Sequence, residues 1–213
     1  RACSTWAAAP DASFSTACKN LSSLLVSLLD APAPDLVIYL QAPTGVLRQR
    51  VQKRGNDFEQ RVDPDYLARL SGVPVAEVDD SQPLTPGVHL APADYHLLAG
   101  ERAFRLSVDE KVIHARPSID VLFESAAESH RKQLAAVLLT AASRDGAAGV
   151  VRVAGLGGRA YVQDPSTAES SVAPAAALAA LGEAGRSARV GSPRRIGEWL
   201  RAEGCGTERR EEP

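Results

Sequence analysis

The feature that most constrains the fold of this chain is a strand, loop, helix and strand pattern between residues 134 and 164. Residues 134–140 form an apolar run, and a second run, residues 159–164, follows after a helix-length interval. The interval opens with Ala141-Ala-Ser-Arg-Asp145-Gly-Ala-Ala-Gly149, in which an aspartate precedes small residues that suit the start of a helix. This pattern is typical of two buried parallel strands joined by a helix. The sequence therefore predicts a βαβ unit, with Asp145 at the carboxyl end of its first strand.

Three roles are open to Asp145 at that position. Ligands of open α/β sheets bind beside the carboxyl ends of strands, so its carboxylate can orient a catalytic imidazole or bind a cation. It can also cap the helix that follows, and position alone favours this structural role.

Five runs of residues resemble a family in which the aspartate at the position of Asp145 is catalytic. They are Gly87-Val-His-Leu-Ala-Pro-Ala-Asp-Tyr-His-Leu-Leu98, Arg116-Pro-Ser-Ile-Asp-Val-Leu-Phe-Glu-Ser125, Leu138-Leu-Thr140, Arg144-Asp-Gly-Ala-Ala-Gly149 and Gly157-Gly-Arg-Ala-Tyr-Val-Gln-Asp164. Through them, residues 71–182 resemble the C-terminal domain of the CheB protein-glutamate methylesterases of chemotaxis, in the family's order and spacing. The resemblance implies a parallel, doubly wound α/β sheet that hydrolyses glutamyl methyl esters, and often deamidates glutamine, with a Ser-His-Asp triad and no cofactor. It implies methylated chemoreceptor helices as substrates, and a receiver domain or a chemotaxis kinase as further partners.

The resemblance also assigns roles to two residues. Asp145 corresponds to the aspartate of the triad, and the backbone N–H of Ala142 takes the family's place in the oxyanion hole. The loop departs from the family because Thr140-Ala-Ala-Ser replaces Thr-Gly-Met-Gly, which would cost the turn if either glycine needed a positive φ. Similarly, Ser170-Ser-Val-Ala-Pro-Ala175 replaces a run with bulkier side chains, a change expected to open the substrate cleft.

The other two members of the triad have no counterpart in the chain. No Gly-x-Ser-x-Gly occurs, and the first histidine, His89, already lies within a matched run where the family has no catalytic base. We therefore expect a sheet that is incomplete on its N-terminal side and a catalytically incomplete enzyme. His96 is expected to be a locally hydrogen-bonded loop residue, with substrate contact as the alternative, and His114 and His130 are expected to be solvated. No spacing of histidines, cysteines or acidic residues predicts a metal site.

A second, local resemblance covers residues 33–70. Three runs are similar to the strand, the lid and the following helix of the deoxynucleoside kinases, which have a P-loop fold. In that order they are Pro34-Asp-Leu-Val-Ile-Tyr-Leu-Gln-Ala42, Arg50-Val-Gln-Lys-Arg-Gly-Asn-Asp-Phe-Glu59 and Asp63-Pro-Asp-Tyr-Leu67. That resemblance implies phosphate contacts from Arg50 and Arg54 and a substrate contact from Glu59. The alternative is a solvated basic helix face. No Gly-x-x-x-x-Gly-Lys-Ser/Thr loop is present to bind the phosphates, so a kinase fragment would be inactive.

Composition agrees with a soluble cytoplasmic protein. The net charge of −2 disfavours nucleic acid and membrane surfaces, and no window approaches the roughly 18 apolar residues of a membrane span. Three scattered cysteines fit a reducing compartment. Residues 1–32 are expected to be partly helical without an assigned family, and residues 183–213 to form a flexible charged tail with one short helix.

Three functions remain open from the sequence: a methylesterase, a deoxynucleoside kinase fragment, and a non-catalytic module that binds receptors. Two families meet near Leu70 and Ser71, and the chain begins with Arg1 and contains no methionine. These features suggest an incomplete or rearranged translation product.

Overall fold

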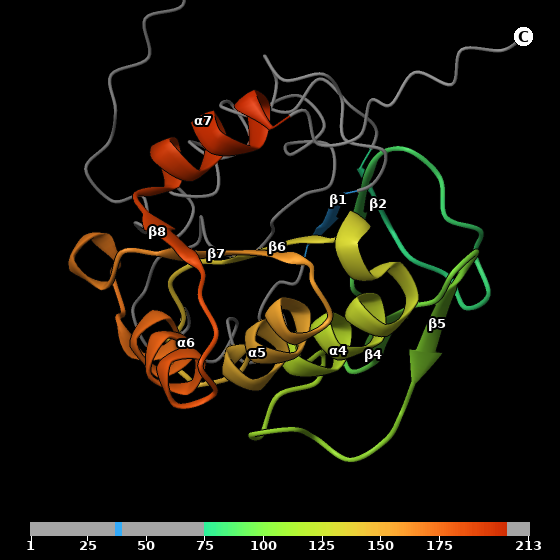
Figure 1. The fold of residues 1–213 in the computed structure, drawn as a ribbon. Coiled ribbons are helices and arrows are strands. Elements are labelled where there is room, and N and C mark those ends of the chain that lie inside the picture. Colours follow the sequence, from blue (N-terminus) through green and yellow to red (C-terminus); the bar gives the residue numbers. More distant parts are fainter. Residues whose placement is uncertain (1–36, 40–74, 204–213) are drawn as a thin grey trace, which may run out of the picture.

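The structure is a computed structural model that describes residues 37–39 and 75–203 of the chain. The predicted kinase-like positions Arg50, Arg54 and Glu59 lie outside these residues, as does the segment 1–32. The described strands form two parallel three-stranded sheets and one antiparallel hairpin. Figure 1 shows helices packed on both faces of the sheet formed by β6, β7 and β8, so the predicted α/β class with parallel strands is confirmed.

The first sheet has the order β1-β3-β2, and all of its pairings are parallel. Its strands are β1 (Val37–Tyr39), β2 (Val75–Glu77) and β3 (Val88–Leu90). The run of residues 34–42, which the sequence likens to a strand, thus contains β1. The neighbour of β1 in this sheet is β3.

A hairpin and a long helix form the next layer. The strands β4 (His96–Ala99) and β5 (Phe104–Ser107) pair in an antiparallel register, and α4 (Ile119–His130) packs against them. Leu97, Phe104 and Leu122 are almost completely buried in their shared core. The hairpin thereby supports α4, whose first turn reaches the candidate site.

The second sheet contains the predicted βαβ unit. The strands β6 (Ala135–Leu138), β7 (Arg159–Gln163) and β8 (Arg189–Gly191) are parallel and in the order β6-β7-β8. The helix α5 (Ala147–Gly155) connects β6 to β7, and α6 (Val172–Glu183) connects β7 to β8. The unit predicted from residues 134–164 is therefore confirmed.

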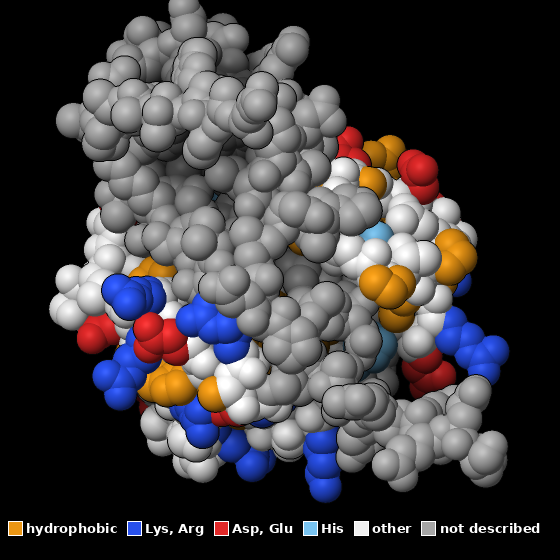
Figure 2. All heavy atoms as spheres, turned by 90° about the horizontal axis from the view of Figure 1, so that it is seen from above, with side chains coloured by type: hydrophobic (Ala, Val, Ile, Leu, Met, Phe, Trp, Pro, Cys, Tyr) orange, Lys and Arg blue, Asp and Glu red, His pale blue; other side chains and the backbone are white. Residues whose placement is uncertain are grey.

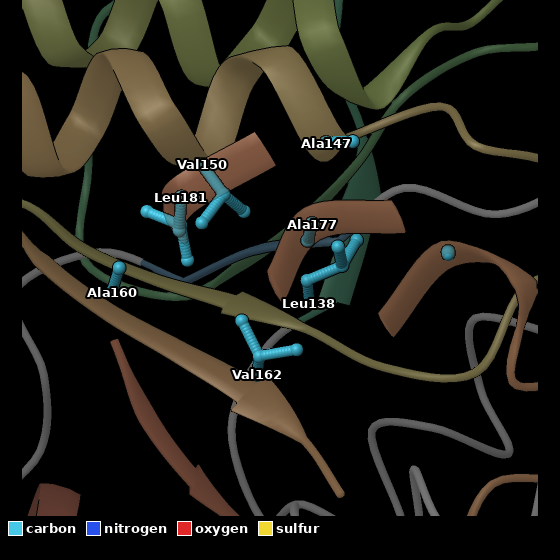
Figure 3. Packing of buried hydrophobic residues seen from close by; sticks show 8 residues of the cluster. Leu138, Ala147, Val150, Ala160, Val162, Ala177 and Leu181 are labelled. Atoms are coloured by element: carbon cyan, nitrogen blue, oxygen red, sulfur yellow. The ribbon is translucent and has the colours of Figure 1, made fainter. Parts of the chain in front are cut away.

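Side chains on alternating faces of β7 contact different helices. Ala160 and Val162 face α5 and α6, where they join Leu138, Val150 and Leu181 in one apolar cluster (Figure 3). Tyr161 faces the opposite way and packs on Ile196 and Leu200 of α7 (Pro193–Ala202). Since successive side chains of a strand point to opposite faces, this alternation fixes helices on both sides of the sheet.

The C-terminal part of the chain contains the expected short helix and an additional strand. Residues 189–202 form β8 and α7; α7 is the one helix expected in this tail, whereas β8 was not expected. Ile196 is completely buried, and Leu200 nearly so, against the sheet. Ser192 caps α7, and Pro193 occupies its first turn, so the start of this helix is well defined despite the charged sequence.

Candidate active site

The carboxyl ends of β6 and β7 are joined by a polar network. Gln163 is fully buried, and its Oε1 accepts a hydrogen bond from the backbone N–H of Thr140 at 2.9 Å. The Thr140 hydroxyl donates to the carbonyl of Ser170 at 3.1 Å and accepts from the N–H of Ser170 at 2.8 Å. Gln163 Nε2 donates to the carbonyl of Thr167 at 3.0 Å. These bonds join the start of the loop that leads to Asp145 with the segment that follows β7.

Asp145 is buried, and its carboxylate binds the first turn of α4. Ser118 Oγ donates to Oδ1 at 2.7 Å, the N–H of Asp120 donates to Oδ1 at 3.1 Å, and the N–H of Ile119 donates to Oδ2 at 2.9 Å. Asp145 therefore caps a helix, as its position suggested. The helix is α4, however, and not α5, which directly follows it.

Asp120 makes the corresponding contact with α5. Its Oδ1 accepts a hydrogen bond from the N–H of Gly149, in the first turn of α5, at 2.7 Å. Asp145 thus accepts from N–H groups at the start of α4, and Asp120 of α4 accepts from one at the start of α5. These N–H groups have no partner within their own helix. We call this arrangement of Ser118, Asp120, Asp145 and Gly149 the reciprocal cap.

Within the reciprocal cap, the ionised form of Asp120 is unfavourable. Burial raises the pKa of the Asp120 carboxyl above 3.8, and the negative charge of Asp145 raises it further, against the effect of the Gly149 N–H. Folding therefore takes up a proton in the pH range just above 3.8, and the stability that Asp120 contributes falls as the pH rises through its folded pKa.

Replacement of Asp120 by asparagine should remove this pH dependence. The amide oxygen of Asp120→Asn can still accept from Gly149, but the side chain no longer titrates. We expect the free energy of unfolding of the variant, relative to the parent, to increase with pH from 3.8 upward and then become constant. Urea unfolding of both proteins at a series of pH values measures the difference. A difference that stays constant with pH would contradict the assignment to Asp120.

The loop before Asp145 forms its turn without the family's two glycines. No residue from 141 to 145 has a positive φ, so alanine and serine fit the backbone there. The left-handed position is Gly146, with φ 98°, where a Cβ would lie 2.7 Å from Leu138 Cδ1. Ala142 is exposed, and its N–H has no hydrogen-bond partner among the described residues. A free N–H at this edge of the sheet can donate to a developing oxyanion.

The four histidines of the chain all lie in the described part, and none donates to the Asp145 carboxylate. His96 is not the locally hydrogen-bonded loop residue that was expected: it is buried at the start of β4, and its Nε2 lies 3.0 Å from the carbonyl oxygen of Glu110, 14 residues away. His89 Nε2 binds the carbonyl of Thr85 at 2.8 Å. His114 is exposed, as predicted, whereas His130 is half-buried.

Sequence reasoning missed Ser118, Asp120 and Gln163. Ser118 follows a proline and precedes an apolar helical run, which is a recognisable N-cap signal. No local pattern indicates that its partner is Asp145, which lies 27 residues away in the sequence. The role of Gln163 as the partner of Thr140 follows only from the pairing of β6 with β7.

Two further properties concern the described residues alone. Between residues 75 and 203, no group of three or more histidine, cysteine, aspartate or glutamate side chains could hold a metal ion. Within the same part of the chain, no helix is both long enough and apolar enough to cross a membrane.

The fold and the carboxyl edge of the β6-β7-β8 sheet define an α/β domain with parallel sheets and a buried aspartate at the carboxyl end of a strand. Residues 37–200 match the CheB methylesterase family, and the chain belongs to that family. The resemblance stated from the sequence is thereby confirmed. The match begins at residue 37, so it includes most of the segment 33–70. The comparisons do not show the resemblance of that segment to deoxynucleoside kinases, and they give a P-loop kinase fragment no support.

Relatives and a solved structure are consistent with this assignment. A Leptospira interrogans protein named as a putative protein-glutamate methylesterase/protein-glutamine glutaminase is 41% identical over 116 residues, which cover 54% of this chain and 60% of the relative. Another, from Cupriavidus pinatubonensis, is 36% identical over 159 residues, 72% of this chain and 41% of the relative. The crystal structure of the Thermotoga maritima CheB methylesterase catalytic domain has a TM-score of 0.67 and 27% identity, covering 87% of this chain and 92% of that domain. The chain spans less than two thirds of the length of both curated relatives.

Proposed function

We propose that this domain serves protein-glutamate methylester hydrolysis and glutamine deamidation on chemoreceptor helices, in the cytoplasm. Membership of the CheB methylesterase family supports this function, and so do the names of the relatives. A receiver domain or a chemotaxis kinase is the proposed regulatory partner.

The observation that carries the proposal is the placement of Asp145. Its carboxylate stands at the carboxyl end of β6 and already has a fixed orientation, because three donors of α4 bind it. A carboxylate offers about four lone-pair sites, so one site on Oδ2 is left for a further donor. An imidazole N–H bound at this site would be held in one tautomer and stabilised when it becomes charged. The exposed N–H of Ala142 would bind the oxyanion.

A serine nucleophile and a histidine base would complete this site. In the proposed reaction, the serine attacks the ester carbonyl while the histidine takes its proton and returns it to the leaving methanol. None of the four histidines of this chain is hydrogen-bonded to Asp145, so none of them is proposed as the base.

Methanol release from a methylated receptor fragment tests the function. The 213-residue chain and the complete translated product of its gene should be assayed side by side. We expect release by the complete product, and a loss on the order of 10³-fold or more in its Asp145→Asn variant. Because that change also disturbs the reciprocal cap, Ser118→Ala serves as the matched control: it weakens the cap but keeps the carboxylate.

Each contrary outcome has a distinct meaning. Absence of methanol release from the complete product would overturn the proposed hydrolysis. Binding of the receptor fragment without release, by both proteins, would assign the non-catalytic receptor-binding function instead. Equal losses in Asp145→Asn and Ser118→Ala would show that helix capping, and not catalysis, explains the effect of Asp145.

A further inference from the structure

A tryptophan on α7 holds two arginines at the surface of the domain. The guanidinium carbon of Arg189, in β8, lies 5.6 Å from the ring centroid of Trp199, and that of Arg195 lies 5.3 Å from it. The indole is itself fixed, because a Cβ on Gly191 would lie only 3.0 Å from its Cη2 and Cζ3 atoms. A guanidinium stacked on an aromatic face is restricted in orientation, while its N–H edge stays available for a carboxylate.

The same segment is locally basic. Residues 189–203 contain four arginines and two glutamates, a formal charge of +2 in a chain whose net charge is −2. The Arg194 side chain is 84% exposed and that of Arg189 55%. Figure 2 shows Lys and Arg side chains gathered on one side of the upper face, with a few acidic groups among them.

Ion pairs within the domain use only some of these cations. Arg194 pairs with Glu198 at 3.2 Å, and Arg189 pairs with Glu203, which also accepts from the Tyr161 hydroxyl. Arg195 forms no ion pair with a described residue, and its guanidinium lies over the ring of Trp199. The structure thus contains an exposed, pre-oriented guanidinium group without an anionic partner in residues 75–203.

We propose that Arg189, Arg194, Arg195 and Trp199 form an arginine–tryptophan surface that binds an acidic segment of a partner protein, one with several aspartate or glutamate side chains. Separate carboxylates can each take one guanidinium edge in a bidentate geometry. A continuous phosphate backbone fits less well, because Glu198 and Glu203 lie among the arginines and the rest of the chain is acidic. This inference goes beyond the proposed hydrolysis and does not depend on it, because the surface shares no residue with the edge that holds Asp145.

Binding of a glutamate homopeptide, followed by the fluorescence of Trp199 and by calorimetry, tests the proposal. The chain has two tryptophans, so a Trp6→Phe background makes Trp199 the sole reporter. We expect Arg195→Gln to raise the dissociation constant about 3- to 5-fold, as the loss of one exposed ion pair does. Arg195→Lys, which keeps the charge but loses the planar group, should have a smaller effect.

Arg105→Gln is the matched control, because Arg105 is exposed on β5, outside the proposed surface, and the change in charge is the same. It should leave peptide binding unchanged. The proposal is overturned if the peptide does not bind, or if Arg105→Gln weakens binding as much as Arg195→Gln. It is also overturned if an RNA oligonucleotide or an anionic phospholipid vesicle binds more tightly than the peptide.

Discussion

Replacement of Asp145 by alanine should lower the free energy of unfolding by about 3 kcal/mol. The variant leaves the hydroxyl of Ser118 and the N–H groups of Ile119 and Asp120 without their acceptor in a buried place. Each lost acceptor of this kind costs roughly 1–3 kcal/mol, and the removal of repulsion with Asp120 offsets part of the sum. Urea unfolding followed by circular dichroism measures the change.

Asp79→Ala is the appropriate control for this experiment. Asp79 is exposed, and its carboxylate makes no recorded hydrogen bond with a described residue, so its removal should change the stability by less than about 0.5 kcal/mol. Similar losses in both variants would mean that Asp145 contributes little to the cap of α4. The reciprocal cap would then be an incidental arrangement.

Replacement of Gly149 by alanine should destabilise the protein by about 2–3 kcal/mol, although alanine is the better helix former. A Cβ at position 149 would lie 2.6 Å from Phe123 Cβ and 3.2 Å from Asp120 Cα, so α4 and α5 would have to separate. Their separation would also lengthen the hydrogen bond from Gly149 N–H to Asp120. Thermal or urea unfolding of the purified variant tests this result.

The same substitution on α6 should have the opposite sign. A Cβ on Gly182 would meet no atom within 4 Å, and this glycine lies near the end of a helix. Gly182→Ala should therefore stabilise the protein by about 0.5 kcal/mol through helix propensity. If Gly149→Ala were also neutral or stabilising, the close approach of α4 and α5 would not be essential to the fold.

The sequence was sufficient to predict those elements whose signals are local. Two apolar runs around a loop with Asp145 predict β6, α5 and β7, because a buried parallel strand and a helix start each have a short-range pattern. The two replaced glycines of the loop raised a concern about the turn. The backbone explains why the turn survives: the positive φ is needed at Gly146, which the sequence retains.

Long-range pairing could not be predicted in the same way. The neighbour of β1 is β3, which follows it at a long distance in the sequence, and the partner of the Asp145 carboxylate is a helix that precedes it. Residues 183–213 were expected to form a flexible charged tail with one short helix, and β8 was not expected. Burial of Ile196 and Leu200 against Tyr161 outweighs that composition, and composition alone does not reveal where such a face will dock.

The reciprocal cap has a consequence for how this family is read from sequence. Where a carboxylate caps a helix as well as serving chemistry, a copy that has lost all catalytic ability still gains stability from that carboxylate. The aspartate in an Asp-Gly-Ala-Ala-Gly run therefore does not by itself distinguish an active methylesterase from an inactive descendant. That distinction has to come from the nucleophile and the base.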